Sequence, residues 1–296
     1  MMLVEIVRIT LVVLCVTCSL CFDASAADRF AVERKKGSVD VKIDGELFTT
    51  YHELFQNKPI LHPIIGPTGK AMTRPIEGKG DHPHHSSLWF THGKVNGIDF
   101  WHKKGRIEHQ QYVTVEGGKR AIIETKAAWK DNDGDAFASE HRTMTFDADD
   151  KLRWIDIDLT FTAIKSVTFG QTKEGSFGVR VWPESTVKNG GAILNSEGDK
   201  NNDAWSKPAA WVDYFGPNRG ETLGIAILTH PGSFRFPTPW HVRTYGLFTS
   251  NPFMKEDFKL PPGESFTLRY RFVFHRGTTE EAGIAKIFED FASKTK

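Results

Sequence analysis

The chain has 296 residues, with 38 Lys and Arg against 37 Asp and Glu, so its formal net charge is +1. A balance this close to neutral excludes a protein that binds nucleic acid or an anionic membrane surface through bulk charge. All the cysteines lie near the start, at Cys15, Cys18 and Cys21. The rest of the chain therefore has no thiol nucleophile and no thiolate metal site.

The first residues have the parts of a secretory signal in their usual order. A short segment with one basic residue precedes the apolar run 9–20, and the small residues 24–26 follow it. The run is too short to cross a bilayer as a stable helix, and the small residues form a cleavage site at the right distance. We expect residues 1–27 to be a signal peptide cleaved near Ala26. The exported, periplasmic or secreted chain would then have no membrane span, and an uncleaved membrane anchor is the alternative.

Alternation of apolar and polar residues indicates β-strands along most of the chain. Segments 39–43 and 47–51 alternate on either side of Asp44 and Gly45, which is the pattern of a hairpin. Connections between such segments are rich in Gly, Pro, Asn and Asp. Further segments with strand character are 112–115, 121–129, 137–146, 152–161, 177–182, 209–214, 222–228, 242–248 and 265–275.

The C-terminal segment has a helical pattern instead. Thr278 and Glu281 have the spacing of a capping box. An apolar stripe at helical spacing follows, formed by Ile284, Ile287, Phe288 and Phe291. We expect this helix to pack on the edge of a sheet.

These elements predict one all-β domain that spans residues 28–296. The chain shows no linker, low-complexity tract or repeat, and roughly 270 residues can bury a sizeable core without disulfides. Many long strands with long loops favour a large two-sheet antiparallel β-sandwich, with one C-terminal helix, over a small barrel.

Histidine is concentrated in one part of the chain. Six of the 12 histidines lie close together, at His82, His84, His85, His92, His102 and His109. Gly80 and Pro83 interrupt any regular helix there, so we expect the first three on a shaped loop. Imidazole exchanges protons near neutral pH, which makes this loop a candidate for acid–base chemistry. Any one histidine is more often structural, and the concentration is what favours a site.

The same loop offers ligands for a metal ion. His82, His84 and His85 are the candidate ligands, and Asp81, Asp99 and Glu108 could complete a shell of nitrogen and oxygen donors. The spacing lacks the two histidines on one helix face that are typical of zinc proteases. We expect that no cofactor is required and keep a divalent metal as an open alternative.

A second group of polar residues lies within 240–253. If 242–247 form a strand, His241, Arg243 and Tyr245 project to the same side. Polar side chains are seldom buried unpaired, so this face is expected to line either a pocket or an internal polar network. Arg243 suits a carboxylate or several hydroxyl groups.

Carboxylates supply the candidate general bases. Glu174 precedes a segment in which Arg180 and Trp182 share one face, and Glu108 and Glu77 are the other candidates. The sequence does not choose among them. It contains no phosphate-binding glycine loop, no Gly-x-Ser-x-Gly elbow and no dinucleotide fingerprint, which disfavours nucleotide binding and serine hydrolase chemistry.

Several longer motifs stand out: DHPHH (81–85), LWFTHG (88–93), NGIDFW (96–101), WHVRTYG (240–246) and NPF (251–253). They resemble the DUF6807 family, which also carries the label "methane oxygenase PmoA", and the resemblance extends from about Phe30 to His275. Ser86 and Met254 depart from the family pattern, where Arg and Gly are common. The first departure could alter a contact at the mouth of the site. A membrane methane oxygenase is excluded, since we expect no membrane span.

Residues 57–69 (NKPILHPIIGPTG), followed by the histidine-rich loop, are remotely similar to the opening of aldose mutarotases and other galactose mutarotase-like proteins. That resemblance implies a mutarotase-like supersandwich, in which a His acid and a Glu base act on a sugar in a groove across one sheet. It is an analogy at the level of the fold.

We therefore expect an exported carbohydrate-active protein that performs epimerisation, hydrolysis or elimination on a small-molecule or oligosaccharide ligand. The candidate acid–base residues are His84, His85, His92, His241, Glu108 and Glu174. The candidate substrate-binding residues are Asp81, Trp89, Asn96, Trp101, Arg180, Trp240, Arg243 and Tyr245. A non-catalytic glycan-binding module and a His-ligated metal protein are the alternatives.

Overall fold

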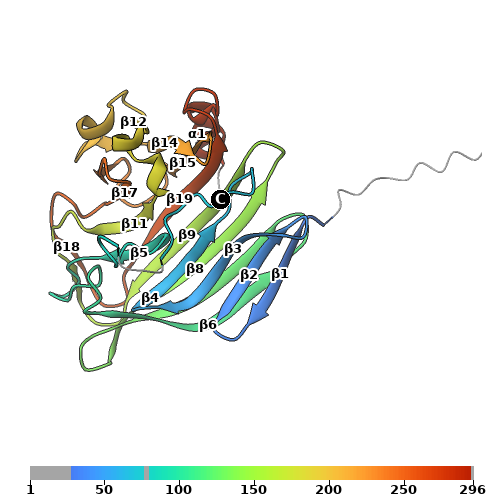
Figure 1. The fold of residues 1–296 in the computed structure, drawn as a ribbon. Helices are drawn as coiled ribbons and strands as arrows, with labels where there is room; N and C mark the ends of the chain where they lie inside the picture. Colours follow the sequence, from blue (N-terminus) through green and yellow to red (C-terminus); the bar gives the residue numbers. More distant parts are fainter. Residues whose placement is uncertain (1–27, 77–79, 295–296) are drawn as a thin grey trace, which may run out of the picture.

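The computed structural model describes residues 28–76 and 80–294, and this part of the chain is built mainly of β-strands (Figure 1). The expected signal peptide, residues 1–27, and the candidate base Glu77 lie outside the described residues. Two large antiparallel sheets and one C-terminal α-helix form the fold, so the expected all-β sandwich is confirmed. No helix in the described part is long and apolar enough to cross a membrane.

The first sheet has nine strands in the order β1-β2-β3-β4-β5-β11-β17-β16-β13. Its second half places strands side by side that are far apart in the sequence. The strands are β1 (Phe30–Lys35), β2 (Ser38–Ile43), β3 (Glu46–Phe55), β4 (Lys58–Ile64), β5 (Leu88–His92), β11 (Gly175–Arg180), β17 (Leu247–Ser250), β16 (Thr238–Val242) and β13 (Pro208–Ala209).

The second sheet has eight strands in the order β12-β14-β15-β19-β9-β8-β7-β6. These are β12 (Ala192–Asn195), β14 (Trp211–Asn218), β15 (Glu221–Thr229), β19 (Ser265–Arg276), β9 (Arg153–Ala163), β8 (Ala136–Ala148), β7 (Ala121–Lys130) and β6 (Arg106–Glu116). The remaining short elements are β10 (Val167–Phe169), which pairs with β18 (Phe258–Leu260), and the 3₁₀ helices η1 (Pro183–Ser185), η2 (Val187–Asn189) and η3 (Asn201–Ala204).

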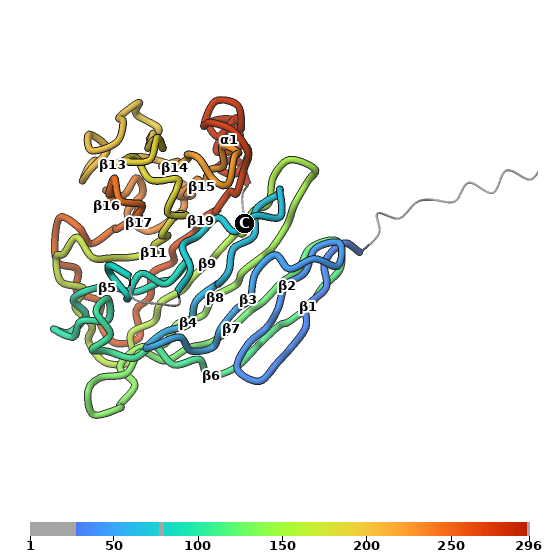
Figure 2. Tube along the Cα trace, in the orientation of Figure 1, coloured from blue at the N-terminus to red at the C-terminus, as the bar shows by residue number. Residues whose placement is uncertain are grey.

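The core lies between the two sheets and follows from the alternation of side chains along each strand. In β9, Ile155, Ile157, Leu159 and Phe161 are buried, whereas the residues between them are partly exposed. Figure 2 shows β1–β4 of the first sheet lying across β6–β9 of the second. Burial of each large apolar side chain contributes about 1.5–3 kcal/mol, so these inward-facing rows hold the sandwich together.

The predicted C-terminal helix is present as α1 (Ile284–Ala292). Thr278 N donates to Glu281 Oε2 at 2.8 Å and Glu281 N donates to Thr278 Oγ1 at 3.3 Å, so the capping residues close the turn before the helix. The helix packs on the outer face of the second sheet, not on its edge as expected, because interior strands present apolar residues there. These residues are Trp211, Ala226, Leu228 and Val273.

The segment 242–248, predicted as one strand, contains the turn of a hairpin between β16 and β17. Arg243 N donates to Leu247 O at 2.7 Å, and Gly246 N donates to Arg243 O at 2.9 Å. Gly246 has a φ of 108°, a backbone conformation that favours glycine. Apolar and polar residues keep alternating through this turn, so the sequence pattern predicts one continuous strand there. The prediction that His241, Arg243 and Tyr245 lie on one face of a single strand is therefore wrong. His241 belongs to β16, whereas Arg243 and Tyr245 lie in the turn.

A buried ion pair fixes the segment before α1 against the second sheet. His275 Nε2 lies 3.0 Å from Asp213 Oδ1, and His275 Nδ1 lies 3.2 Å from the carbonyl oxygen of Arg276. Both partners accept hydrogen bonds, so both ring nitrogens donate and the ring is an imidazolium. Thr279 Oγ1 donates to the second oxygen of Asp213 at 2.6 Å. Burial lowers the pKa of His275, but the charge and hydrogen bond of Asp213 outweigh burial and raise the pKa above its ordinary value.

We expect Asp213→Asn to lower the free energy of unfolding by about 3–5 kcal/mol, because it removes the partner of a buried charge. The raised pKa of His275 means that the pair stabilises the fold fully below the unfolded pKa of about 6.5, and less as pH rises through the folded pKa. Urea unfolding between about pH 6 and about pH 9 should show a fall in wild-type stability that is smaller in the variant.

Asp290→Asn is the matched control, because it removes an exposed carboxylate paired with Lys286. It should change the free energy of unfolding by less than about 1 kcal/mol and leave the pH dependence as in the wild type. The buried ion pair is contradicted if Asp213→Asn and the wild type show the same pH dependence.

Candidate functional site

A cavity opens on the outer face of the nine-stranded sheet, above β5, β11, β16 and β17. The inward-facing Phe90 belongs to the main core, whereas the outward-facing Trp89 belongs to a separate apolar layer with Trp101 and Leu247. Gly178 makes room for this layer, since a Cβ there would lie 2.8 Å from the Trp89 ring. Trp101 and Leu247 of this layer line the cavity, and Trp89 is buried behind them.

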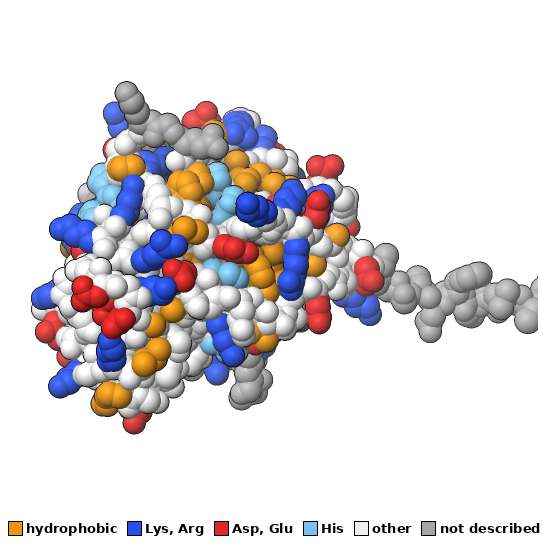
Figure 3. Space-filling view, turned by 90° about the horizontal axis from the view of Figure 1, so that it is seen from below, with side chains coloured by type: hydrophobic (Ala, Val, Ile, Leu, Met, Phe, Trp, Pro, Cys, Tyr) orange, Lys and Arg blue, Asp and Glu red, His pale blue; other side chains and the backbone are white. Residues whose placement is uncertain are grey.

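The cavity has a volume of about 430 Å³, which is in the range of small-ligand sites. Its walls come from the loops on either side of β5, the residues before β11, η3 and the β16–β17 turn. The lining residues are His82, His84, His85, Trp101, His102, Lys173, Glu174, Asn202, His241, Arg243, Thr244, Tyr245 and Leu247. Of these side chains, only that of Leu247 has no hydrogen-bonding group. Figure 3 shows histidine side chains at the molecular surface, close to Lys and Arg side chains.

Two guanidinium groups anchor the loop that carries the first three histidines. Arg74 donates to Asp81 Oδ1 at 2.6 Å and to the backbone carbonyl of His82 at 2.9 Å. Arg180 donates to both carboxylate oxygens of Asp81, at 3.2 and 3.0 Å. Burial raises the pKa of Asp81, but hydrogen bonds from His82 and Arg180 outweigh burial and lower the pKa to about 2. Asp81 is therefore ionised and ties the loop to the sheet.

Ring stacking and a hydrogen bond fix His82 and His85. The His82 ring stacks on His85, with ring centres 4.8 Å apart, and on Tyr245, with ring centres 5.0 Å apart. His85 Nδ1 lies 3.1 Å from Arg180 Nη1, and arginine only donates, so the His85 ring is neutral with its proton on Nε2. Burial, followed by repulsion from His84 and Arg180, lowers the pKa of His85 well below its ordinary value.

His102 is oriented by Asp99. Asp99 Oδ2 accepts a hydrogen bond from His102 Nδ1 at 2.9 Å, and Asp99 Oδ1 accepts one from the backbone N–H of His102 at 2.9 Å. The neutral ring then carries its proton on Nδ1 and has a lone pair on Nε2. The side chain is half-exposed and lines the cavity, so His102 can act as a base toward a ligand.

His84 lies between His85 and His102, with its ring centre 4.5 Å from each of theirs. Burial, followed by repulsion from His102, lowers the pKa of His84 to about 4. Lys58 is fully buried behind the loop, where its Nζ lies 3.5 Å from the His84 carbonyl oxygen and burial lowers its pKa to about 7. His84 is therefore a neutral hydrogen-bonding group at neutral pH.

Glu174 supplies a carboxylate to the cavity wall. Thr172 Oγ1 donates to Glu174 Oε2 at 2.6 Å, and Lys173 forms an ion pair with Oε1. Burial raises the pKa of Glu174, but the hydrogen bonds from Lys173 and Thr172 outweigh burial and hold the pKa below its ordinary value. Glu174 is therefore ionised at neutral pH, and it can accept a proton or stabilise a positive charge.

His241 and Arg243 form a pair in the cavity wall. Arg243 Nε donates to His241 Nε2 at 3.1 Å, so the neutral His241 ring carries its proton on Nδ1. Burial, followed by repulsion from Arg243, lowers the pKa of His241 to about 3. With Nε2 occupied and protonation disfavoured, His241 positions Arg243.

The residues selected from the sequence fall into three groups. Those in the cavity wall are His84, His85, Trp101, Glu174, His241, Arg243 and Tyr245. Those behind the wall, where they contact His85 or the loop that carries it, are Asp81, Trp89 and Arg180. Those outside the wall are His92, Asn96, Glu108 and Trp240.

The four residues outside the wall have other partners. His92 is fully buried, and its Nε2 donates to a backbone carbonyl at 2.8 Å. Trp240 points into the core, and its Nε1 donates to the backbone of β13 at 2.9 Å. Glu108 pairs with a lysine of β7. The Asn96 side chain accepts a hydrogen bond from the backbone of β10 at 2.7 Å.

The cavity wall also contains polar side chains that were not predicted from the sequence as acid–base or substrate-binding residues. They are His82, Lys173, His102, Asn202 and Thr244. The spacing of Asp99 and His102 was a usable signal, since an Asp three residues before a His can accept a hydrogen bond from it in a turn. Asn202 and Thr244 give no such signal, because only the pairing of distant strands brings them here.

Within residues 28–76 and 80–294, no three His, Cys, Asp or Glu side chains are arranged to hold a metal ion. In the candidate set of His82, His84 and His85, one ring has no nitrogen available for a divalent metal. His85 Nδ1 accepts from Arg180, and His85 Nε2 carries the ring proton. A cation at these rings would also be repelled by the adjacent guanidinium.

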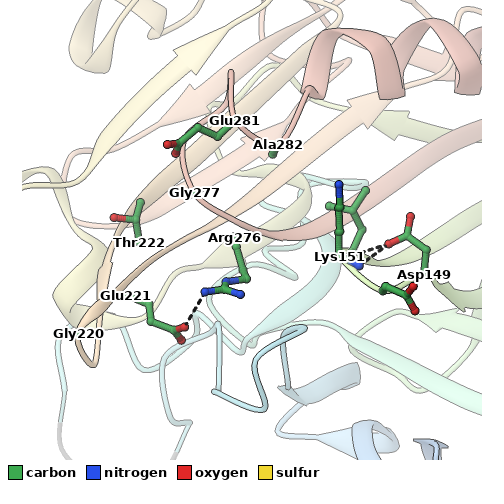
Figure 4. Close-up of a pocket in the computed structure, with 11 residues that line it drawn as sticks. Asp149, Lys151, Gly220, Glu221, Thr222, Arg276, Gly277, Glu281 and Ala282 are labelled. Atoms are coloured by element: carbon green, nitrogen blue, oxygen red, sulfur yellow. Dashed lines mark hydrogen bonds and ion pairs between the residues drawn. The ribbon is translucent and has the colours of Figure 1, made fainter.

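A larger pocket of about 730 Å³ lies beside the segment that leads to α1 (Figure 4). It is lined by the β8–β9 turn, the β14–β15 turn and the residues after β19. Arg276 pairs there with Glu221 at 3.4 Å, and Asp149 accepts from the backbone N–H of Lys151 at 2.7 Å. It contains no histidine and shares no lining residue with the histidine cavity. The histidine cavity is therefore the candidate site.

The fold and the cavity define a β-sandwich protein with a polar ligand site on the outer face of one sheet. The chain belongs to the family described as "Family of unknown function (DUF6807)", whose model matches residues 38–289. The resemblance drawn from the sequence motifs is thus confirmed. No curated protein matches the sequence.

Solved structures similar to this chain include the GH36 alpha-galactosidase AgaB from Geobacillus stearothermophilus, at 11% identity and a TM-score of 0.47. That alignment covers 83% of this chain but 41% of the galactosidase, so the chain spans less than half of its length. A galactose mutarotase-like protein from Lactobacillus casei is 9% identical with a TM-score of 0.37, over 83% of this chain and 100% of that one. The Slr1438 protein from Synechocystis is 11% identical with a TM-score of 0.38, over 84% and 96%. At these scores the structures carry no argument about ligand or activity.

We expect an NMR titration to show the rings of His84 and His241 neutral at about pH 6, because burial opposes their protonation. His102→Gln should raise the pKa of His84 from about 4, since the variant removes a neighbouring positive charge. Ring nitrogen and carbon chemical shifts measure both effects.

His141→Gln is the matched control, because it removes an exposed histidine that pairs with Glu124 and does not line the cavity. It should leave the titration of His84 unchanged. A wild-type His84 that titrates at an ordinary pKa of about 6.5 would contradict its burial in the cluster.

Proposed function

We propose that the protein binds a sugar in the histidine cavity and catalyses a proton transfer on it. One observation carries this proposal: a single cavity wall combines His102, oriented by Asp99, with the ionised carboxylate of Glu174. An oriented imidazole and a carboxylate that face one ligand space are the parts that acid–base catalysis requires.

The lining favours a ligand with many hydroxyl groups. His, Asn, Thr, Tyr, Lys and Arg side chains offer donors and acceptors in several directions, and the apolar surface is limited to Leu247 and Trp101. A sugar ring matches both surfaces, because it has hydroxyl groups at its rim and C–H groups on its faces. An apolar ligand would leave many lining groups unpaired, which costs free energy. The volume of about 430 Å³ suits a mono- or disaccharide.

The proposed chemistry divides the removal and the delivery of a proton between different groups. His102 Nε2 is the base. Burial raises the pKa of Tyr245, so its phenol keeps its proton and can donate it. Glu174 accepts a second proton or stabilises developing positive charge. This division is common to the three reactions considered, which are epimerisation, hydrolysis and elimination at a sugar.

We also propose that residues 1–27 direct export and that residues 28–296 act outside the cytoplasm. The support is the order of basic, apolar and small residues at the start of the chain. Mass spectrometry of the protein expressed with its leader should give a chain that begins close to Ala27. A full-length mass in the membrane fraction would favour the uncleaved anchor instead.

The catalytic proposal is tested by turnover and binding of a panel of mono- and oligosaccharides. We expect the wild type to turn over at least one sugar, and His102→Gln and Glu174→Gln each to lower kcat by about 10²–10⁴-fold. Sugar binding should change by less than about tenfold in these variants. Asp99→Asn should lower kcat less than His102→Gln does, because it disturbs the orientation of the base and leaves the base in place.

His141→Gln again serves as the control and should keep wild-type turnover. Two results would overturn parts of the proposal. Sugar binding without turnover in the wild type would favour the non-catalytic glycan-binding module. Failure to bind any member of the panel would reject the sugar site itself.

A further inference from the structure

Arg243 has a guanidinium group in the cavity wall. It forms no ion pair with any residue in the described part of the chain, whereas Arg74 and Arg180 both pair with Asp81. The arginines behind the wall thus both have a carboxylate partner within the protein. The positive charge of Arg243 is therefore available to interact with a ligand in the cavity.

Two contacts hold the Arg243 guanidinium in place. Its Nε donates to His241 Nε2 at 3.1 Å, and the group lies over the Trp205 ring with its central carbon 4.2 Å from the ring centre. Since an arginine has five N–H donors, these contacts fix the plane of the group and leave donors for a ligand.

The surrounding charges favour an anion at this point. The cavity wall carries Lys173 and Arg243 against one carboxylate, that of Glu174. Lys173 and Glu174 form an ion pair with each other, so their charges compensate locally. The positive charge of Arg243 remains, in a cavity whose partial exclusion of water strengthens charge–charge interactions.

We propose that the cavity recognises an acidic sugar, a uronic acid residue whose carboxylate binds the guanidinium of Arg243. A planar carboxylate accepts two parallel hydrogen bonds from a planar guanidinium, which is stronger and more directional than the binding of hydroxyl groups. This assignment rests on the proposed sugar-binding function and adds the charge of the ligand to it. His241 is then a positioning residue that sets the orientation of the guanidinium.

The test compares each acidic sugar with its own methyl ester, which keeps the ring and the hydroxyl groups but removes the charge. Isothermal titration with galacturonate and glucuronate mono- and disaccharides, their methyl esters and the neutral parent sugars measures the preference. We expect the wild type to bind at least one acid about tenfold or more tightly than its ester. The Arg243→Gln variant should bind the acid and the ester with nearly equal affinity, and it should still bind the ester.

Arg219→Gln is the matched control, because the Arg219 guanidinium also lies over a tryptophan, Trp182, at 4.1 Å, but outside the cavity. It should keep the wild-type preference for the acid. An unchanged thermal unfolding transition shows that Arg243→Gln is folded. Arg243→Lys, which keeps the charge and loses the planar fork, should retain part of the preference.

The outcomes separate this inference from the proposed function. If the wild type binds neutral sugars and esters as well as it binds the acids, the acidic-sugar assignment fails and the sugar site stands. If no acid, ester or neutral sugar binds, both fail. A preference for the acid that survives Arg243→Gln would also overturn the assignment, because another group would then hold the carboxylate.

Discussion

Strand alternation in β5, β11, β16 and β17 is the constraint on which both the core and the site depend. Every second side chain of these strands packs between the sheets, so residues such as Phe90 and Trp240 belong to the core of the sandwich. The intervening positions face outward, where Trp89 supports the cavity from behind and His241 lines its wall. Because neighbouring side chains serve different faces, the cavity can be polar without burying polar groups in the core.

Electrostatics divides the charged groups of this region into two classes. Asp81 pairs with both arginines behind the wall, and burial keeps the rings of His84, His85 and His241 neutral. The cavity is thus lined mainly by neutral hydrogen-bonding rings and by few charged side chains. A ligand consequently meets a small number of fixed charges in defined places, which favours selectivity over general attraction.

The sequence predicted the fold more completely than the site, for physical reasons that individual residues show. Strand alternation is local, so segments such as 152–161, which becomes β9, could be recognised without the rest of the chain. The residues 242–248 alternate equally well, but Gly246 turns the chain there. The histidine cluster and the polar group around Arg243 could be predicted from the concentration of polar residues in two segments of the sequence. That His92 and Trp240 face inward, and that Asn202 joins the wall, depends on long-range pairing that no local pattern contains.

The short turn between β16 and β17 has a consequence for how this architecture can diversify. Arg243 and Tyr245 lie on the turn, whereas the strands that flank it are anchored by the core. Insertion, deletion or substitution in the turn would reposition both side chains and leave the hydrogen-bonded ladder of β16 and β17 in register. Related chains could therefore exchange one ligand for another by changing a few loop positions, with the sandwich inherited intact.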